Sequence, residues 1–160
     1  MENQLPAVLC PYCHQPAQLV SSKEVYRRDY GPIYLCRPCE AWVGCHDGTF
    51  RPLGRLANAE LREWKMKAHA AFDPIWEGLC NAEVRRVGPY SGLKHIIRNE
   101  AYRRLAERLG IKVGECHIGE FDVETCRRVV DICKQGLEVP LDHLRSKRGR
   151  RLLLPDQERR

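Results

Sequence analysis

The first 50 residues alternate short apolar runs with turn-forming residues. Apolar and β-prone side chains gather in AQLVSS (17–22), EVYRRDY (24–30), PIYLCR (32–37) and AWVGC (41–45). Runs of this kind are typical of short antiparallel strands, and Gly31 before Pro32 predicts a turn. They contain few large apolar side chains, and a fold of about 40 residues with so small a core usually needs a metal, disulfides or a partner. The pattern therefore predicts a small sheet with a further source of stability.

Beyond residue 56 the apolar period changes from two to about 3.6, which predicts helices. Asn58 is a favoured N-cap for a first helix. Its apolar positions are Leu61, Trp64, Ala68, Ala71, Phe72 and Ile75. We expect Asp73 and Pro74 to interrupt this helix and begin a second one, because Asp is a favoured cap and Pro favours the first helical position.

Two further helices are predicted in the second half of the chain, after a loop at VGPYSG (87–92). The third helix ends at Gly110. Its apolar stripe is Leu93, Ile97, Ala101, Leu105 and Leu109. The fourth helix is capped by Asp122 and stops at Gly136. Its inward positions are expected to be Val123, Cys126, Val130 and Cys133.

The composition is that of a globular protein, with 43% apolar and 30% charged residues among 160. No stretch approaches the roughly 18 consecutive apolar residues of a membrane span. The N-terminus, MENQLPAVLC, lacks the basic residues and the long apolar run of a secretory signal. We therefore expect a cytoplasmic protein without a membrane partner. In that compartment nine cysteines are better explained by metal ligation or burial than by disulfides.

Four of the cysteines form two C-x-x-C pairs. Cys10 and Cys13 are separated from Cys36 and Cys39 by 22 residues. Each pair can turn two sulfurs and its backbone N–H groups towards one ion, and the hairpin between them brings the pairs together. Four soft sulfurs favour Zn²⁺, and four protein ligands leave no open position for a substrate. The spacing predicts one structural zinc ion.

These elements predict an α+β fold. Residues 1–50 are expected to form a four-cysteine zinc ribbon of short antiparallel strands. Residues 51–139 are expected to form a small helical region packed on the ribbon, and residues 140–160 a basic C-terminal extension.

Longer motifs resemble a known family. They are CPYC, YGPIYLCRPCEAWVGCHDGT, PLGRLANAELREWKMKAHAAFDPIW, AYRRLAERLGI and CHIGEFDVETCRRVVDIC. From about residue 8 to residue 136, the chain resembles a zinc-finger-containing domain of unknown function found in bacteria and their phages. The resemblance implies a phage or mobile-element setting and no reaction. It implies the same zinc ligands, Cys10, Cys13, Cys36 and Cys39.

Two further groups contain residues that can ligate metal or transfer protons. His46 can act as an alternative zinc ligand or face a partner, but with Cys45 it is better interpreted as a strand residue packed near the metal turn. His69 and Asp73 are spaced to face each other on a helix, as a general base and its orienting carboxylate. The favoured interpretation is structural, because Asp73 is expected to cap a helix.

A second metal site is the alternative use of the later cysteines. Cys116 and His117 can be completed by Cys126 with Cys133 or Asp122. No C-x-x-C turn organises this group, and buried free cysteines behave as small apolar residues, so burial is the favoured interpretation.

The net charge of +6 is concentrated at the C-terminus, where residues 145–160 hold seven Lys or Arg and two acidic residues. Basic and aromatic side chains also alternate in the ribbon, around Tyr26, Tyr30 and Tyr34. Such combinations can hold phosphates and stack bases. The candidate nucleic-acid contacts are Arg27, Arg28, Arg37, Lys147, Arg148, Arg150 and Arg151. The basic residues of the third helix are interpreted as a solvated face, because Glu100 and Glu107 can pair with its arginines.

We therefore expect a non-catalytic zinc-binding protein of phage or bacterial origin that binds DNA or RNA largely through electrostatics. The alternative is a protein-binding adaptor that modulates a host protein or defence system. A nuclease is a third interpretation, because His46, Asn58 and His69 occur in the order of an H-N-H motif, but no local pattern supports it.

Overall fold

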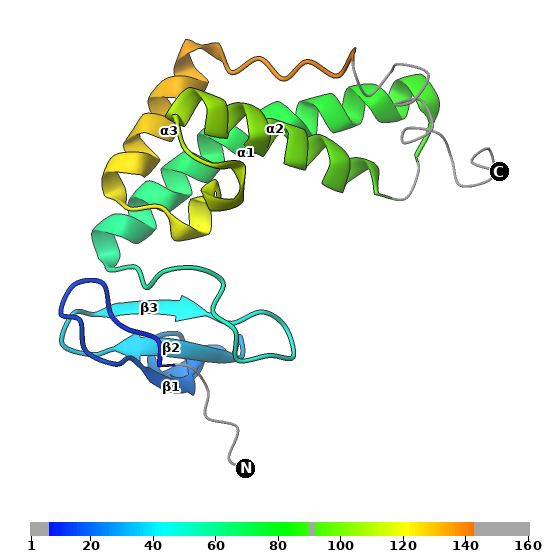
Figure 1. The fold of residues 1–160 in the computed structure, drawn as a ribbon. Helices are drawn as coiled ribbons and strands as arrows, with labels where there is room; N and C mark the ends of the chain where they lie inside the picture. The colour runs from blue at the N-terminus through cyan, green and yellow to red at the C-terminus, as the bar shows by residue number, and fades with distance from the viewer. Residues whose placement is uncertain (1–6, 90–91, 143–160) are drawn as a thin grey trace. The chain divides into compact units, whose positions relative to one another are not determined.

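The computed structural model describes residues 7–89 and 92–142 (Figure 1). A small antiparallel sheet is followed by three helices, so the predicted α+β class is confirmed. The strands are β1 (Gln18–Ser21), β2 (Pro32–Cys36) and β3 (Ala41–Gly44). The helices are α1 (Ala59–Val87), α2 (Leu93–Leu109) and α3 (Val123–Gly136). The tail candidates Lys147, Arg148, Arg150 and Arg151 lie outside the described residues.

The chain divides into two compact units. Of the described residues, the first unit contains residues 7–65 together with Gly119–Val123, and the second contains the described part of Met66–Ile118 and residues 124–142. The boundaries expected from the sequence, and the packing of the helical region on the ribbon, stay predictions.

The sheet has the strand order β1-β2-β3, with antiparallel pairing throughout. Leu19 lies opposite Tyr34 on one side, and Tyr34 lies opposite Val43 on the other. Tyr34 is buried and donates its hydroxyl hydrogen to the carbonyl oxygen of Phe50 at 3.0 Å. Pairing of the central strand on both sides therefore places one buried tyrosine at the centre of the ribbon.

The strand predicted over residues 24–30 is wrong. This segment is a short 3₁₀ turn (Ser22–Glu24) followed by an irregular loop. The buried hydroxyl of Ser22 accepts the backbone N–H of Tyr30 at 2.7 Å, and Asp29 accepts the N–H of Gly31 at 2.9 Å. These local bonds satisfy backbone groups that a strand would pair with a neighbour. Gly31 has a φ of +93°, which confirms the predicted turn.

The helix boundary predicted at Asp73 and Pro74 is also wrong, because α1 continues through Pro74. The buried positions Ala68, Phe72 and Trp76 stay in phase across the proline. Proline costs the helix one backbone hydrogen bond, and the continuous apolar stripe outweighs that local preference. The predicted start is confirmed: the side-chain oxygen of Asn58 accepts the N–H of Leu61 at 3.0 Å.

The apolar stripe of α2 is confirmed, since all five predicted positions are buried. In α3 the buried residues are Cys126, Val129 and Ile132, whereas Val130 and Cys133 are half-buried, so the predicted stripe is displaced. Side-chain contacts join these helices in the second unit. Phe72 of α1 packs on Tyr102 of α2 with ring centroids 4.7 Å apart, and Arg128 of α3 donates to the carbonyl oxygen of Leu109 at 2.7 Å. None of the helices within the described ranges combines the length and the apolar character required to cross a bilayer.

Candidate metal centre

Two tight turns present the four predicted ligands. In the first turn, the N–H of His14 donates to the carbonyl oxygen of Cys10 and the N–H of Cys10 donates to that of Gln15, both at 2.9 Å. In the second turn, the N–H of Glu40 donates to the carbonyl oxygen of Arg37 at 3.1 Å. The second turn joins β2 to β3, and a bridge between Leu9 and Pro16 closes the first. Each pair of sulfurs is therefore fixed by its own backbone hydrogen bonds.

The four sulfurs converge on one point. The ligand atoms of Cys10, Cys13, Cys36 and Cys39 all lie within 4.8 Å of one another, and the Sγ atoms of Cys13 and Cys36 are 3.6 Å apart. Zn–S bonds of about 2.3 Å in a tetrahedron place the sulfurs roughly 3.8 Å apart. The observed spacing and the all-sulfur donor set fit a zinc ion, with all four cysteines as ligands.

Backbone groups of the turns favour a thiolate at Cys10. Burial opposes its ionisation, but hydrogen bonds from the backbone at Tyr12 and Cys13, and from neighbouring thiols, lower the pKa of Cys10 to about 7. The pKa of Cys39 is raised to about 12, chiefly because its hydrogen bond with Cys13 favours the protonated form. Burial raises the pKa of Cys36. A bound cation would compensate the charge of four thiolates, which is the role of a structural zinc ion.

The site is continuous with the core of the ribbon. Cys10 and Cys36 are both buried, and they pack in one cluster with Tyr34, Ala41 and Leu56. Half-buried neighbours complete the cluster: Val8, Cys13, Ala17, Leu19, Cys39, Val43 and Cys45. The metal ligands therefore supply part of the apolar core that the strands lack.

The turns are also tied to the start of α1. The hydroxyl oxygen of Tyr12, inside the first C-x-x-C pair, accepts the N–H of Asn58 at 3.1 Å. Arg62 donates to the carbonyl oxygen of Ala57 at 2.6 Å, and its guanidinium lies 3.4 Å from the ring centroid of Trp42. These contacts could not be predicted from the sequence, because residue spacing carries no signal for them.

The other candidate ligands do not join this set. Among the residues that the structure describes, the four cysteines are the one group of three or more His, Cys, Asp or Glu close enough to hold an ion. His46 is exposed in the turn after β3, so its predicted packing in a strand is wrong, whereas Cys45 pairs with Pro52 in a β-bridge. Burial raises the pKa of Cys116 to about 11, and the ring of His117 stacks on Tyr102 with centroids 5.7 Å apart.

His69 and Asp73 form the predicted pair on α1, with Nδ1 and Oδ2 3.0 Å apart. Asp73 also accepts the indole N–H of Trp76 at 3.0 Å. Its carboxylate therefore links residues on successive turns of one helix. The prediction that Asp73 caps a helix is wrong, because α1 continues past it. These bonds give Asp73 a structural role in positioning a buried tryptophan.

The candidate nucleic-acid contacts in the ribbon differ from one another. Arg27 and Arg28 are exposed and make no ion pair within the described ranges, whereas Arg37 pairs with Glu24 at 2.7 Å. Tyr26 and Tyr30 are exposed, in contrast to Tyr34. The loop after Ser22 therefore displays two aromatic rings and two exposed guanidinium groups.

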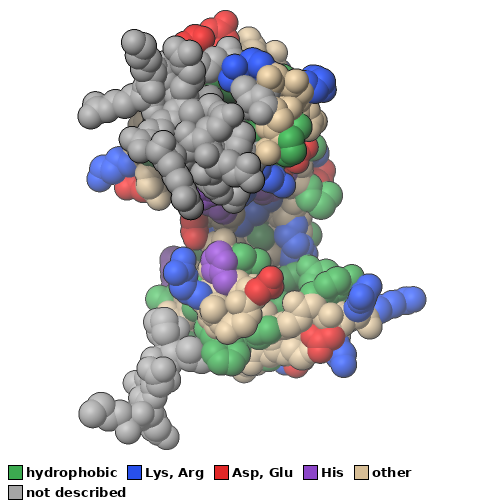
Figure 2. Space-filling view, turned by 90° about the vertical axis from the view of Figure 1, so that its right-hand side faces the viewer, with side chains coloured by type: hydrophobic (Ala, Val, Ile, Leu, Met, Phe, Trp, Pro, Cys, Tyr) green, Lys and Arg blue, Asp and Glu red, His purple; other side chains and the backbone are tan. Residues whose placement is uncertain are grey.

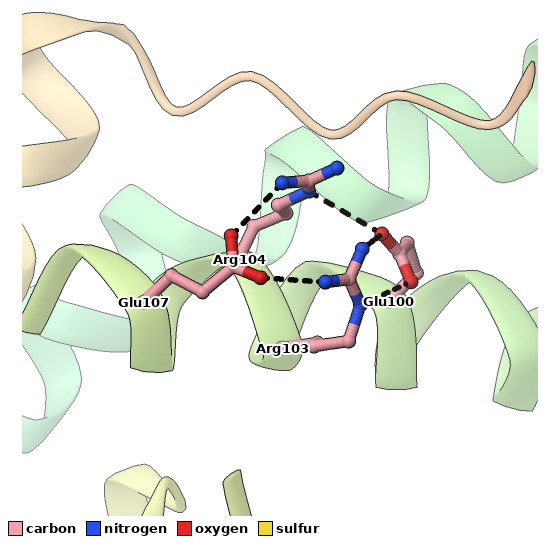
Figure 3. Close-up of polar contacts among 4 residues, drawn as sticks. All are labelled: Glu100, Arg103, Arg104 and Glu107. Atoms are coloured by element: carbon pink, nitrogen blue, oxygen red, sulfur yellow. Dashed lines mark hydrogen bonds and ion pairs between the residues drawn. The ribbon is translucent and has the colours of Figure 1, made fainter. Parts of the chain in front are cut away.

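Two of the arginines of α2, Arg103 and Arg104, pair with Glu100 and Glu107, as the sequence predicted. Arg103 binds both Glu100 and Glu107, and Arg104 donates to Glu107 at 2.9 Å and lies 3.4 Å from Glu100 (Figure 3). Such i,i+3 and i,i+4 pairs neutralise one another on a helix surface. The segment around Arg103 and Arg104 therefore offers little net positive charge to a phosphate.

Comparison with known proteins places this metal centre in a family. The model of a zinc-finger-containing domain matches residues 6–136. No curated protein and no solved structure matches the chain. The family match covers both C-x-x-C turns, the sheet and all three helices. With its four converging cysteines and its matching length, the chain belongs to the zinc-finger-containing domain family.

Proposed function

We propose that the protein is a non-catalytic, cytoplasmic nucleic-acid-binding protein in a bacterial or phage setting. The zinc ion would hold the ribbon in shape, and the ribbon would present the loop after Ser22. The observation that carries this proposal is the exposure of Tyr26 and Tyr30 beside Arg27 and Arg28, which make no ion pair with residues 7–89 or 92–142. Cations of this kind hold phosphates, and aromatic rings stack on bases.

The charge distribution supports different contributions to binding from the C-terminal tail and from the loop after Ser22. The described residues contain 20 Lys or Arg and 18 Asp or Glu, and on the face drawn in Figure 2 the two signs are interspersed. Residues 145–160 carry seven basic and two acidic residues. Long-range attraction to phosphate would therefore come from the tail, and the loop would add local contacts.

Fluorescence anisotropy with labelled DNA and RNA, repeated over a salt series, tests the proposal. Binding is expected to weaken steeply with salt, with a log–log slope of about −0.7 per phosphate contact on single strands. Replacing Lys147, Arg148, Arg150 and Arg151 with Gln should reduce that slope by up to about 3. Replacing Arg27 and Arg28 with Gln should weaken binding further. Failure of the zinc-loaded protein to bind any nucleic acid at low salt would overturn the proposal.

A protein-binding adaptor is the alternative, and the near balance of charge in the described residues favours it. An interface without phosphate contacts would depend far less on salt. Partner capture from a lysate, with and without nuclease treatment, separates the two functions. Partners lost on nuclease treatment support nucleic-acid binding, and a partner that survives it supports the adaptor.

A further inference from the structure

The first unit contains an aromatic pocket of about 460 Å³. Its aromatic walls are Tyr26, Tyr30 and Trp42, with Ile33 and Leu53 as apolar lining. Small-molecule sites have volumes of roughly 300–1000 Å³, so the pocket has room for a flat ring system.

Hydrogen bonds hold the walls of the aromatic pocket in place. Tyr26 is almost perpendicular to both of its aromatic neighbours, at 84° to Tyr30 and 86° to Trp42. The indole N–H of Trp42 donates to the hydroxyl oxygen of Tyr26 at 2.9 Å. Ser22 accepts the backbone N–H of Tyr30, a residue that is nevertheless 69% exposed. The pocket is thus formed before a ligand arrives, with one exposed ring at its edge.

The surrounding charges decide what the pocket can hold. The Arg62 guanidinium already lies 3.4 Å from the centroid of Trp42, where it occupies one face of the indole. A second cation would be repelled at that face of the indole and by Arg27 and Arg28, which follow Tyr26 in the loop. The acidic residue of the pocket lining is Asp47. Phosphate groups attached to a flat ligand would instead be attracted to these arginines.

We propose that the aromatic pocket holds one unpaired base of a single-stranded nucleic acid, with Arg27 and Arg28 contacting its phosphates. This inference rests on the proposed function and adds the substrate class. The bases of a duplex are stacked and paired, so placing one in the pocket requires additional free energy to unpair and unstack it. The protein therefore prefers single strands to duplexes of the same length.

Asp47 gives the aromatic pocket a preference among bases. It lines the pocket and makes no hydrogen bond or ion pair with the part of the chain that the structure describes. A carboxylate accepts hydrogen bonds only, so it favours the amino group of cytosine over the carbonyl oxygen at the same position of thymine. We expect tighter binding to oligo-dC than to oligo-dT.

Anisotropy with the full-length, zinc-loaded chain tests this inference, with oligo-dC and oligo-dT of about 12 nucleotides and a duplex of equal length as probes. Tyr30→Ala should weaken single-strand binding about 5- to 150-fold and leave duplex binding unchanged. Tyr30→Phe retains the ring and should bind like the natural sequence. Phe50→Ala, an exposed aromatic outside the pocket lining, is the matched control and should also have no effect.

Asp47→Asn tests the base preference separately. Loss of a negative charge strengthens binding to every strand, so the informative quantity is the ratio of the dC and dT affinities, which should fall towards one. Equal single-strand binding by the Tyr30→Ala variant and the natural protein would overturn the inference while leaving nucleic-acid binding intact. Absence of binding to all three probes would overturn both proposals. Zinc content and unfolding midpoint confirm that each variant is folded.

Discussion

His14 and Glu40 occupy equivalent positions in the two metal-binding turns. Each directly follows the second cysteine of its pair, and each has a positive φ, 59° for His14 and 47° for Glu40. This left-handed conformation costs a residue with a Cβ atom roughly 1–2 kcal/mol, whereas glycine adopts it freely. Both turns thus hold a strained residue directly beside a ligand.

Replacing His14 with glycine should stabilise the zinc-loaded protein by about 0.5–1 kcal/mol, because relief of strain exceeds the entropy that glycine adds to the unfolded chain. The measurement is the urea midpoint. His14→Ala removes the same side chain without relieving the backbone, so it serves as the control. Equal midpoints for the glycine and alanine variants would show that the turn is unstrained.

Replacing Cys36 with serine should abolish stoichiometric zinc binding and unfold the ribbon, because the ribbon has too little apolar core without its metal. Elemental analysis should give one zinc per natural chain, and ¹H–¹⁵N spectra of the variant should lose the dispersed signals of the strands. Cys45→Ser, which alters a cysteine outside the ligand set, should keep its zinc. Native chemical shifts in the ribbon after zinc removal would contradict this expectation.

Zinc affinity should rise steeply with pH. Zinc binds thiolates, and the raised pKa values of Cys36 and Cys39 keep those two thiols protonated at neutral pH. Binding must therefore release at least two protons, so the apparent affinity should increase by a factor of about 100 or more per pH unit between pH 6 and pH 8. Competition with a chelator of known protonation constants measures this slope. A slope near zero would mean that the thiols ionise before the metal binds.

Gly54 approaches the backbone of Gly119 within the first unit. A Cβ atom at residue 54 would lie 2.2 Å from the Gly119 carbonyl oxygen, which also accepts the N–H of Arg55 at 3.1 Å and the ammonium of Lys65 at 2.6 Å. Gly54→Ala should therefore destabilise the protein by about 1–3 kcal/mol or more in urea unfolding. Gly114→Ala, where a Cβ meets nothing within 4 Å, is the control.

The features that the sequence predicted well are set by local spacing. Each C-x-x-C turn fixes its own pair of sulfurs. The two turns then converge once β1 and β2, which lie between them in the sequence, have paired. The apolar stripe of α2 follows from helical periodicity in the same way, and the pairs between Glu100 and its arginines follow from i,i+3 and i,i+4 spacing.

The features that the sequence missed depend on residues distant in the chain or on competition between local signals. Pro74 favours a helix start, but burial of Phe72 and Trp76 on one stripe carries α1 through it. Residues 24–30 have strand propensity, but the buried hydroxyl of Ser22 bonds the loop instead. The aromatic pocket and the approach of Gly54 to residue 119 arise from tertiary contacts, which no periodicity in the sequence predicts.

Cys10 and Cys36 have two roles, because they are metal ligands and are also buried residues of the ribbon core. An ion could not leave such a site while the surrounding apolar contacts stayed intact. Metal loss and collapse of the sheet should therefore be a single all-or-none event without a partly stripped intermediate. A zinc titration followed by NMR should show two sets of ribbon signals that exchange intensity, and gradual peak movement would indicate a metal that dissociates from a preformed fold.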